Sequence, residues 1–169
     1  ASGGFILSKT GEPTAAELAD ENIYMIVTNQ CTDEEVNMLV WKCLGYRFDG
    51  TNWNSEKCFP KWRERYPTPP DLIGIRVDTK EVDQASLEAN QAIVRSVPQH
   101  ASESLAKFMT PLGWTEDKYA ALTPNKSRRE HCANWLLYYR EELFGYSVEE
   151  LRQRQRARRT DSLHVIHQN

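Results

Sequence analysis

Apolar residues recur at helical spacing in several stretches of the chain, and most of these stretches begin at a capping signal. Thr14 and Glu17 form a capping box, in which a hydroxyl and a carboxylate each satisfy a free backbone donor. This box predicts a helix that runs to about Val27, although the apolar run at its end also fits a strand. The positions expected to face the core are Ala19, Ile23, Ile26 and Val27.

A second capping box, Thr32 with Glu35, predicts a helix that ends at Gly45. Glycine is expected there because a residue in the left-handed conformation closes the last turn of many helices. The apolar positions between these limits follow at helical spacing: Val36, Leu39, Val40, Cys43 and Leu44. We therefore expect this helix to give a full face to the core.

The pattern changes after residue 45, where aromatic residues alternate with turn formers. Asp49-Gly50 is a tight-turn signal between two aromatic arms, and it predicts a short β-hairpin between Tyr46 and Trp53. Repeated prolines up to residue 70 limit the next stretch to one helical turn at 61–65, because proline lacks a backbone donor. Residues 72–77 fit a short strand or an extended segment.

The second half of the chain is predicted to be helical. A helix over 82–97 ends at Pro98, and its apolar stripe comprises Val82, Ala85, Ala89, Ile93 and Val97. Shorter helices are expected over 102–112 and 115–122. Thr123-Pro124 then places a cap and a proline where a long helix to about Phe144 begins. Its inward residues are expected to be Cys132, Trp135, Leu136, Tyr139 and Leu143.

Together these elements predict an α+β fold that is mainly α, with six to seven helices around one core and a small β-hairpin. The length of 169 residues suits one domain. We expect a single globular helical domain over 14–151. Residues 1–13 form an N-terminal extension in this interpretation, and residues 152–169 form a basic C-terminal extension.

The polar ends of the chain stand out against this core. A capping box at Ser147 and Glu150 opens a last helix to about Arg159, but after Leu151 this helix has no apolar stripe. At the other end, only Phe5-Ile6-Leu7 is suited to a core. Because such ends are normally disordered unless they are docked, we expect both to lie on a partner.

The distribution of charge fits either a surface for an acidic partner or a solvated basic tail. The net charge is −3, which argues against a protein that is basic overall. It is divided unevenly, since residues 1–60 carry −5, residues 61–120 carry −1 and residues 121–169 carry +3. No apolar run approaches the roughly 18 residues that span a bilayer, so we expect a soluble protein.

Candidate catalytic chemistry is sparse in this sequence. The four cysteines include no C-x-x-C pair, and no phosphate-binding glycine loop, G-x-S-x-G or H-E-x-x-H motif is present. We therefore predict no cofactor, no metal site and no enzyme. The enzyme alternative would be favoured by a pocket in which His100, His131 or Cys132 meets a carboxylate.

Basic and aromatic residues are the better candidates for binding. Lys126, Arg128 and Arg129 could bind phosphates, or could pair with acidic residues of the same fold, such as Glu130. Two tryptophans, at 53 and 62, lie in the hairpin and proline-rich stretch, where we expect partner-facing anchors. The full set of predicted partner-binding residues is Phe5, Ile6, Leu7, Trp53, Trp62, Lys126, Arg128, Arg129, Arg152, Arg154, Arg156, Arg158 and Arg159.

Several stretches taken together resemble an uncharacterised family, a domain of unknown function of oxygenic phototrophs, both cyanobacterial and plastid-bearing. The resemblance covers about residues 30–151 and carries no catalytic residues to transfer. The stretches are Trp41–Phe48, Phe59–Pro67, Pro69–Gly74, Ala89–Gln91, Ser96–Pro98, Leu122–Arg129 and Asn134–Glu141.

What the resemblance implies is a setting, the plastid stroma with peripheral association to the thylakoid membrane. The chain begins Ala1-Ser2 without methionine, which fits a removed targeting peptide and a trimmed chain equally. From this setting we expect a non-enzymatic extrinsic subunit on the stromal side of a photosynthetic membrane complex, with photosystem I as first choice. The alternative is a plastid RNA-binding or regulatory protein that uses the basic segments 126–129 and 152–159.

Overall fold

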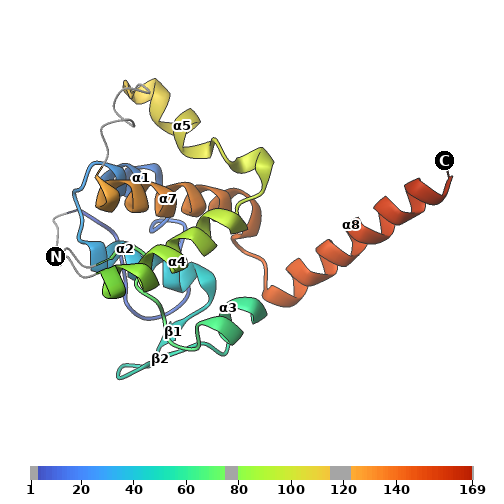
Figure 1. Cartoon of the computed structure of the whole chain (residues 1–169), viewed down its shortest axis with the longest axis horizontal. Helices are drawn as coiled ribbons and strands as arrows, with labels where there is room; N and C mark the ends of the chain where they lie inside the picture. Colours follow the sequence, from blue (N-terminus) through green and yellow to red (C-terminus); the bar gives the residue numbers. More distant parts are fainter. Residues whose placement is uncertain (1–3, 75–79, 115–122, 169) are drawn as a thin grey trace.

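The computed structural model describes residues 4–74, 80–114 and 123–168, and within these ranges the chain is mainly α-helical (Figure 1). Seven α-helices and one antiparallel hairpin are found there, as the sequence predicts. The α-helices are α1 (Asp20–Val27), α2 (Asp33–Leu44), α3 (Pro60–Arg65), α4 (Lys80–Ser96), α5 (Ser104–Met109), α7 (Pro124–Tyr138) and α8 (Val148–Gln168). The short elements are β1 (Arg47–Phe48), β2 (Trp53–Asn54), the 3₁₀ turns η1 (Gln99–Ala101) and η2 (Thr110–Leu112), and the π-helical turn η3 (Tyr139–Leu143).

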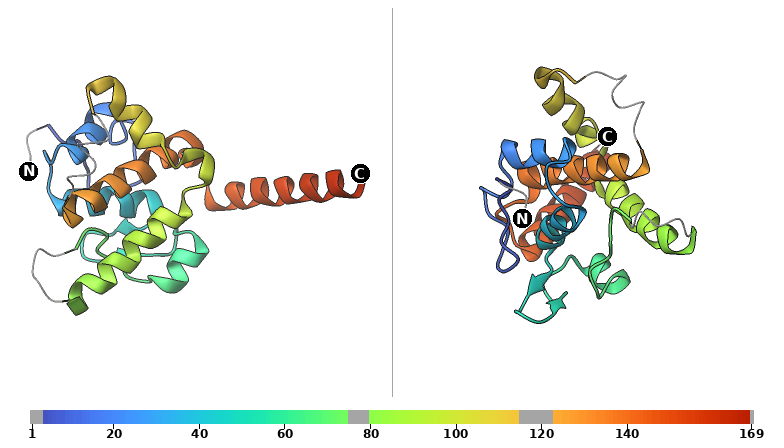
Figure 2. Two further views of the ribbon diagram at one scale, coloured as in Figure 1. Left: turned by 45° about the horizontal axis from the view of Figure 1, so that its top comes forward. Right: turned by 90° about the vertical axis from the view of Figure 1, so that its left-hand side faces the viewer.

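Helix α7 lies at the centre of the body and packs against α1, α2, α4 and α5 (Figure 2). The second half of α7 is buried through apolar side chains, whereas the buried residues of its first half are Arg128, Arg129 and Glu130. Its fully or nearly fully buried apolar residues are Cys132, Ala133, Trp135, Leu136 and Leu137. The predicted long helix is confirmed to residue 143, since η3 continues α7 as a single π-helical turn.

Helix α1 begins later than its capping box predicts. The hydrogen bonds of the box are present, because the Glu17 amide donates to the Thr14 hydroxyl and the Thr14 amide donates to the Glu17 carboxylate. Residues 15–18 nevertheless form turns, and the α-helix starts at Asp20. The predicted apolar face is confirmed at Ile23, Ile26 and Val27, which are buried.

Helix α2 and the hairpin match their sequence signals. Thr32 and Glu35 form the reciprocal capping box, and Gly45 closes the helix at a φ of 112°. A Cβ atom on Gly45 would lie 2.2 Å from the Lys57 carbonyl oxygen, so the close approach of the two segments also requires glycine. In the hairpin, Phe48 is paired with Trp53.

The stretch between α3 and α5 departs from the pattern in three places. Leu72 and Ile73 are buried in bends, not in a strand, while 75–77 and the predicted helix over 115–122 fall outside the described residues. On α4, Ala85 is exposed, and Ser86 and Asn90 are buried beside Ala89 and Ile93. The helix predicted over 102–112 is divided into α5 and η2.

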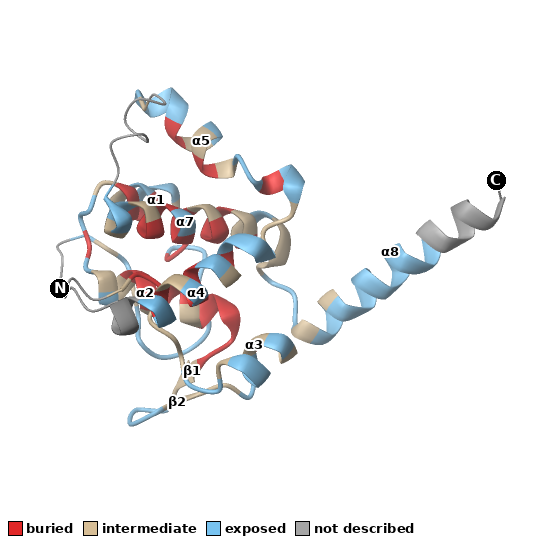
Figure 3. Cartoon of the chain, viewed as in Figure 1, coloured by how far each residue is buried: buried red, intermediate tan, exposed pale blue. Residues whose placement is uncertain are grey.

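Helix α8 leaves the body and projects from it as one straight helix (Figure 3). It continues to Gln168, about nine residues beyond the predicted end at Arg159. Residues 152–161 are all exposed, whereas Val148 and Leu151 at its start are half-buried. The apolar first turn therefore joins α8 to the body, and the basic part extends into solvent.

Candidate functional site

The N-terminal residues predicted to lie on a partner are docked on the chain's own body. Phe5 and Leu7 pack against the core, while Ile6 between them remains 49% exposed. The side chain of Asn22 accepts a hydrogen bond from the Ile6 amide at 3.0 Å and donates to the Ile6 carbonyl at 2.7 Å. The expectation that the interior cannot anchor this end is therefore wrong.

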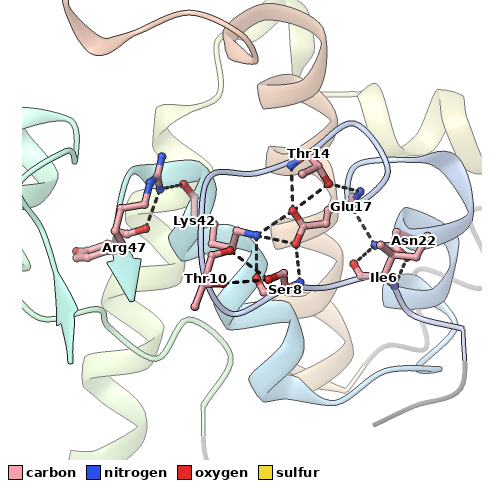
Figure 4. Close-up of polar contacts among 9 residues, drawn as sticks. Ile6, Ser8, Thr10, Thr14, Glu17, Asn22, Lys42 and Arg47 are labelled. Atoms are coloured by element: carbon pink, nitrogen blue, oxygen red, sulfur yellow. Dashed lines mark hydrogen bonds and ion pairs between the residues drawn. The ribbon is translucent and has the colours of Figure 1, made fainter. Parts of the chain in front are cut away.

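A buried ion pair completes this anchor (Figure 4). Lys42 and Glu17 are each 1% exposed, and the lysine Nζ lies 2.7 Å from Glu17 Oε2. The Lys42 ammonium also donates to the Ser8 carbonyl at 2.8 Å, and the Ser8 amide donates to Glu17 Oε2 at 2.9 Å. With Thr14 donating to Oε1, both buried charges have their hydrogen-bonding capacity filled from within the fold.

The predicted phosphate-binding group at 126–129 is largely internal. Arg129 is 2% exposed and donates to Asp33 at 2.8 Å, to the Ile26 carbonyl at 3.1 Å and to the Cys31 carbonyl at 3.0 Å. Arg128 is also buried and donates to the Ile73 carbonyl. These two arginines hold α7 against the rest of the body, so their assignment to a partner is corrected; Lys126 alone of the three is exposed.

The two candidate tryptophans lie in different surroundings. Trp53 is half-buried between Trp41 and Phe48, with ring centroids 5.4 Å apart in both pairs. This packing holds the hairpin against α2. Trp62 stacks on Tyr66 within the α3 region, at 5.1 Å between centroids, and its other side lines an open groove.

This groove, which we call the α8 groove, lies between α3, the end of α7 with η3, and the first half of α8, and has a volume of about 620 Å³. Its aromatic and aliphatic residues are Leu44, Phe59, Trp62, Trp135, Tyr138, Leu143, Val148 and Leu151. Its basic residues are Lys61, Arg152, Arg154, Arg158 and Arg159. The structure thus brings Trp62 together with four of the five predicted C-terminal arginines; Arg156 is exposed on α8 outside this set.

The electrostatics of the α8 groove are strongly positive. Glu142 is the one acidic residue among its described lining, and it is bonded to His100 Nε2 at 2.7 Å. Burial raises the pKa of the Tyr138 hydroxyl, Glu142 adds to the rise, and Arg158 opposes it. An arginine of α8 is therefore close enough to act on the aromatic floor formed by α7.

A capping box in the local sequence explains why α8 begins at Val148. The Glu150 amide donates to the Ser147 hydroxyl at 3.1 Å, and the Ser147 amide donates to the Glu150 carboxylate, which is the predicted capping box. Arg154 lies over the Tyr146 ring at 4.6 Å from its centroid. The sequence did not single out Lys61, Tyr138 or Leu143 as groove residues, although Lys61 is adjacent to Trp62.

A second cleft brings together residues named for the enzyme alternative. It has a volume of about 490 Å³ and is lined by His131 and Glu130, with α4 and α5 opposite. Cys132 is fully buried, and burial raises the pKa of its thiol to about 12, which is the opposite of what a nucleophilic thiolate needs. An imidazole and a carboxylate therefore line the same cleft, but Cys132 adds no activated nucleophile.

In the described part of the chain, no three His, Cys, Asp or Glu side chains gather closely enough to hold a metal ion. Among the same residues, no helix combines the length and the apolarity needed to cross a bilayer.

Fold and groove define a small, mainly helical domain from which a cationic helix projects. The chain belongs to a family of domains of unknown function, DUF1823, whose model matches residues 17–141. This range begins earlier than the resemblance seen in the sequence and ends before α8.

No curated protein matches the chain. A protein whose structure was solved by NMR in solution is similar at 32% identity, with a TM-score of 0.56. The alignment covers 97% of that chain and 78% of this one, so this chain has residues beyond the shared fold.

Proposed function

We propose that the protein is a non-catalytic docking subunit that binds an acidic, amphipathic segment of another protein in the α8 groove. The observation that carries this proposal is the union of an aromatic floor with four exposed arginines on a helix that leaves the body. Aromatic residues and arginine are the side chains most enriched at binding hot spots.

The chemistry of the groove selects the occupant. Five basic residues line it, and the single acidic residue in its described lining is already bonded to His100. Carboxylates of a partner would therefore meet unpaired positive charge along α8, while apolar side chains would cover Trp62 and Leu143. Charge complementarity of this kind sets orientation and speeds encounter, and the buried aromatic contacts supply most of the affinity.

For the partner itself we propose the stromal side of a photosynthetic membrane complex, with photosystem I as first choice. This part of the proposal rests on the family resemblance to proteins of oxygenic phototrophs, and it implies a plastid location at the thylakoid surface. The RNA-binding alternative loses support because Arg128 and Arg129 are bonded within the fold. Lys126 and the arginines of α8 remain for that role.

The test is binding to purified photosystem I, measured by co-sedimentation at increasing salt. A groove variant replaces four arginines by glutamine, and a matched control variant removes four exposed charges elsewhere. The groove variant changes Arg152, Arg154, Arg158 and Arg159, and the control changes Lys9, Lys57, Arg95 and Lys107. We expect the groove variant to bind at least about tenfold more weakly and the control to bind as the wild type does.

A Trp62→Ala variant separates the groove from simple charge attraction. We expect it to bind about tenfold more weakly while keeping the salt dependence of the wild type, because the arginines remain. Equal losses for the groove variant and the charge control would contradict a specific groove. Strong salt-dependent binding to RNA, with none to photosystem I, would favour the alternative function.

A further inference from the structure

The cleft between the end of α4, α5 and α7 is separate from the α8 groove and has a distinct chemistry. Val94, Val97 and Leu105 line its apolar side, and Glu103, Glu130 and His131 line its polar side. Val94 is an exposed aliphatic residue at this surface. The volume of about 490 Å³ falls in the range of small-molecule sites, which are mostly apolar with a few polar groups that fix orientation.

Glu130 is the unusual member of this cleft. Glu130 as a whole is 6% exposed. Its Oε1 atom is buried and has no hydrogen-bond partner. A buried carboxylate oxygen that lacks a donor is costly, and native proteins rarely leave one so. Burial raises the pKa of Glu130 to about 7, against the influence of Lys126 one turn earlier on α7. Glu130 therefore brings to the cleft lining a carboxylate whose hydrogen-bonding capacity the fold does not fill.

The neighbouring His131 presents a second acceptor. Its Nδ1 lies 2.8 Å from the side-chain oxygen of Asn90, whose amide nitrogen already donates to the carbonyls of Leu72 and Arg128. Since that oxygen can only accept, Nδ1 must carry the proton. Burial and the nearby Arg128 lower the pKa of His131 and favour the neutral ring. In that form Nε2 has a free lone pair.

We propose that this cleft binds a small organic cation, a primary ammonium carried on an apolar body. The ammonium would donate to the Glu130 carboxylate and to His131 Nε2, and the apolar body would cover Val94, Val97 and Leu105. Glu103 at the same cleft adds a second negative charge, and the described lining contains no lysine or arginine. An anion would be repelled by the carboxylates of Glu103 and Glu130.

The experiment is an NMR titration of the full chain with n-butylammonium, following the backbone amides of residues 94–106 and 130–134. We use n-butanol as the neutral probe of the same shape and butyrate as the anionic one. We expect saturable shifts with n-butylammonium at millimolar concentration and shifts at least about tenfold weaker with the other two. Equal responses to all three probes would overturn the proposal, as would no response to n-butylammonium.

Matched variants assign the effect to the buried carboxylate. Glu130→Gln keeps the shape and removes the charge, so we expect the affinity for n-butylammonium to fall at least about tenfold. Glu88→Gln removes an exposed charge on α4 outside the cleft and should leave the affinity unchanged. Circular dichroism confirms that each variant is folded. An unchanged affinity in folded Glu130→Gln would show that the carboxylate does not bind the probe.

Discussion

Residues 5–10 and residues 152–161 lie near opposite ends of the chain, and they are held on the protein in opposite ways. The first is clamped to the body through its backbone by Asn22, Glu17 and Lys42. The second is a helix whose side chains are all exposed (Figure 3). One end is therefore part of the body, whereas the other extends away from it.

The two stretches are held differently because their backbone amides and carbonyls have different hydrogen-bond partners. An extended segment leaves its amides and carbonyls free, so a few buried side chains can hold it by accepting from and donating to them. A helix satisfies its backbone internally, and only its side chains are left to make contacts. Among the described residues of α8, half of those at 152–161 are arginines, and no ion pair joins them to an acidic side chain of the body, which is why we assign them to another molecule.

The largest expected effect on stability comes from removing one charge of the buried Lys42–Glu17 pair. This pair and Asn22 hold residues 5–10, and we call the three residues the clamp. Lys42→Met removes the ammonium and leaves the Glu17 carboxylate unpaired in the interior. We expect the free energy of unfolding to fall by about 3–5 kcal/mol, as for other buried pairs that lose one partner. Urea denaturation measures it. Arg152→Met on α8 is the control and should change the stability by less than about 0.5 kcal/mol; equal losses would contradict the comparison.

Glu17 has hydrogen-bond partners for both carboxylate oxygens, whereas Glu130 has a buried oxygen without one. We expect the free energy of unfolding to depend on pH through Glu130. The pKa of Glu130 is raised from 4.5 to about 7 in the folded state, so the folded protein binds the proton more tightly. This tighter proton binding stabilises the folded state fully below about pH 4.5, and the contribution is lost as the pH rises to about 7. Relative to Glu130→Gln, we expect the wild type to lose up to about 3 kcal/mol between pH 5 and pH 8.

This pH effect is measured by urea unfolding of both proteins across the range. Glu88→Gln, an exposed change on α4, should follow the wild type at every pH. If the difference in the free energy of unfolding between the wild type and Glu130→Gln did not change with pH, the Glu130 carboxyl would have the same pKa in the folded and unfolded states.

A smaller effect is expected from the amide that holds the backbone of Ile6. Asn22→Ala removes its two bonds to Ile6 and one to the Glu17 carbonyl. We expect a loss of about 2 kcal/mol, because buried backbone groups are left without partners. Hydrogen exchange at the Ile6 amide should accelerate as well. Gln153→Ala on α8 is the control, and exchange at Ile6 that stays unchanged in Asn22→Ala would show that the clamp is held elsewhere.

Elements with both a cap and an apolar stripe could be predicted from the sequence. Thr32, Gly45 and the buried face between them fix α2, and Thr123-Pro124 fixes the start of α7. Local signals suffice there because hydrogen bonds at helix ends and burial of one face concern residues close in sequence. The hairpin follows from Asp49-Gly50 for the same reason.

The polar anchors could not be predicted, because their partners are far apart in the chain. Arg129 and Asp33 are 96 residues apart, and Lys42 and Glu17 are 25 apart. In the sequence each reads as a surface charge, since lysine, arginine and glutamate are rarely buried. The candidate site was predicted in part: Trp62 and the arginines of α8 were identified, but not the floor that Tyr138 and Leu143 add from α7 and η3.

The smallest effect on stability, and the largest contrast with the clamp, is expected from removing residues 152–169. This deletion keeps Val148 and Leu151, the half-buried residues that join α8 to the body, and removes a stretch whose described side chains are exposed. Because none of the described side chains at 152–161 is buried, we expect the free energy of unfolding to change by less than about 0.5 kcal/mol. Retention on photosystem I should nevertheless fall, since the removed arginines form the positive wall of the α8 groove. A shortened protein that unfolds early would show that α8 supports the body; one that is stable and retained as before would show that α8 is not the docking element.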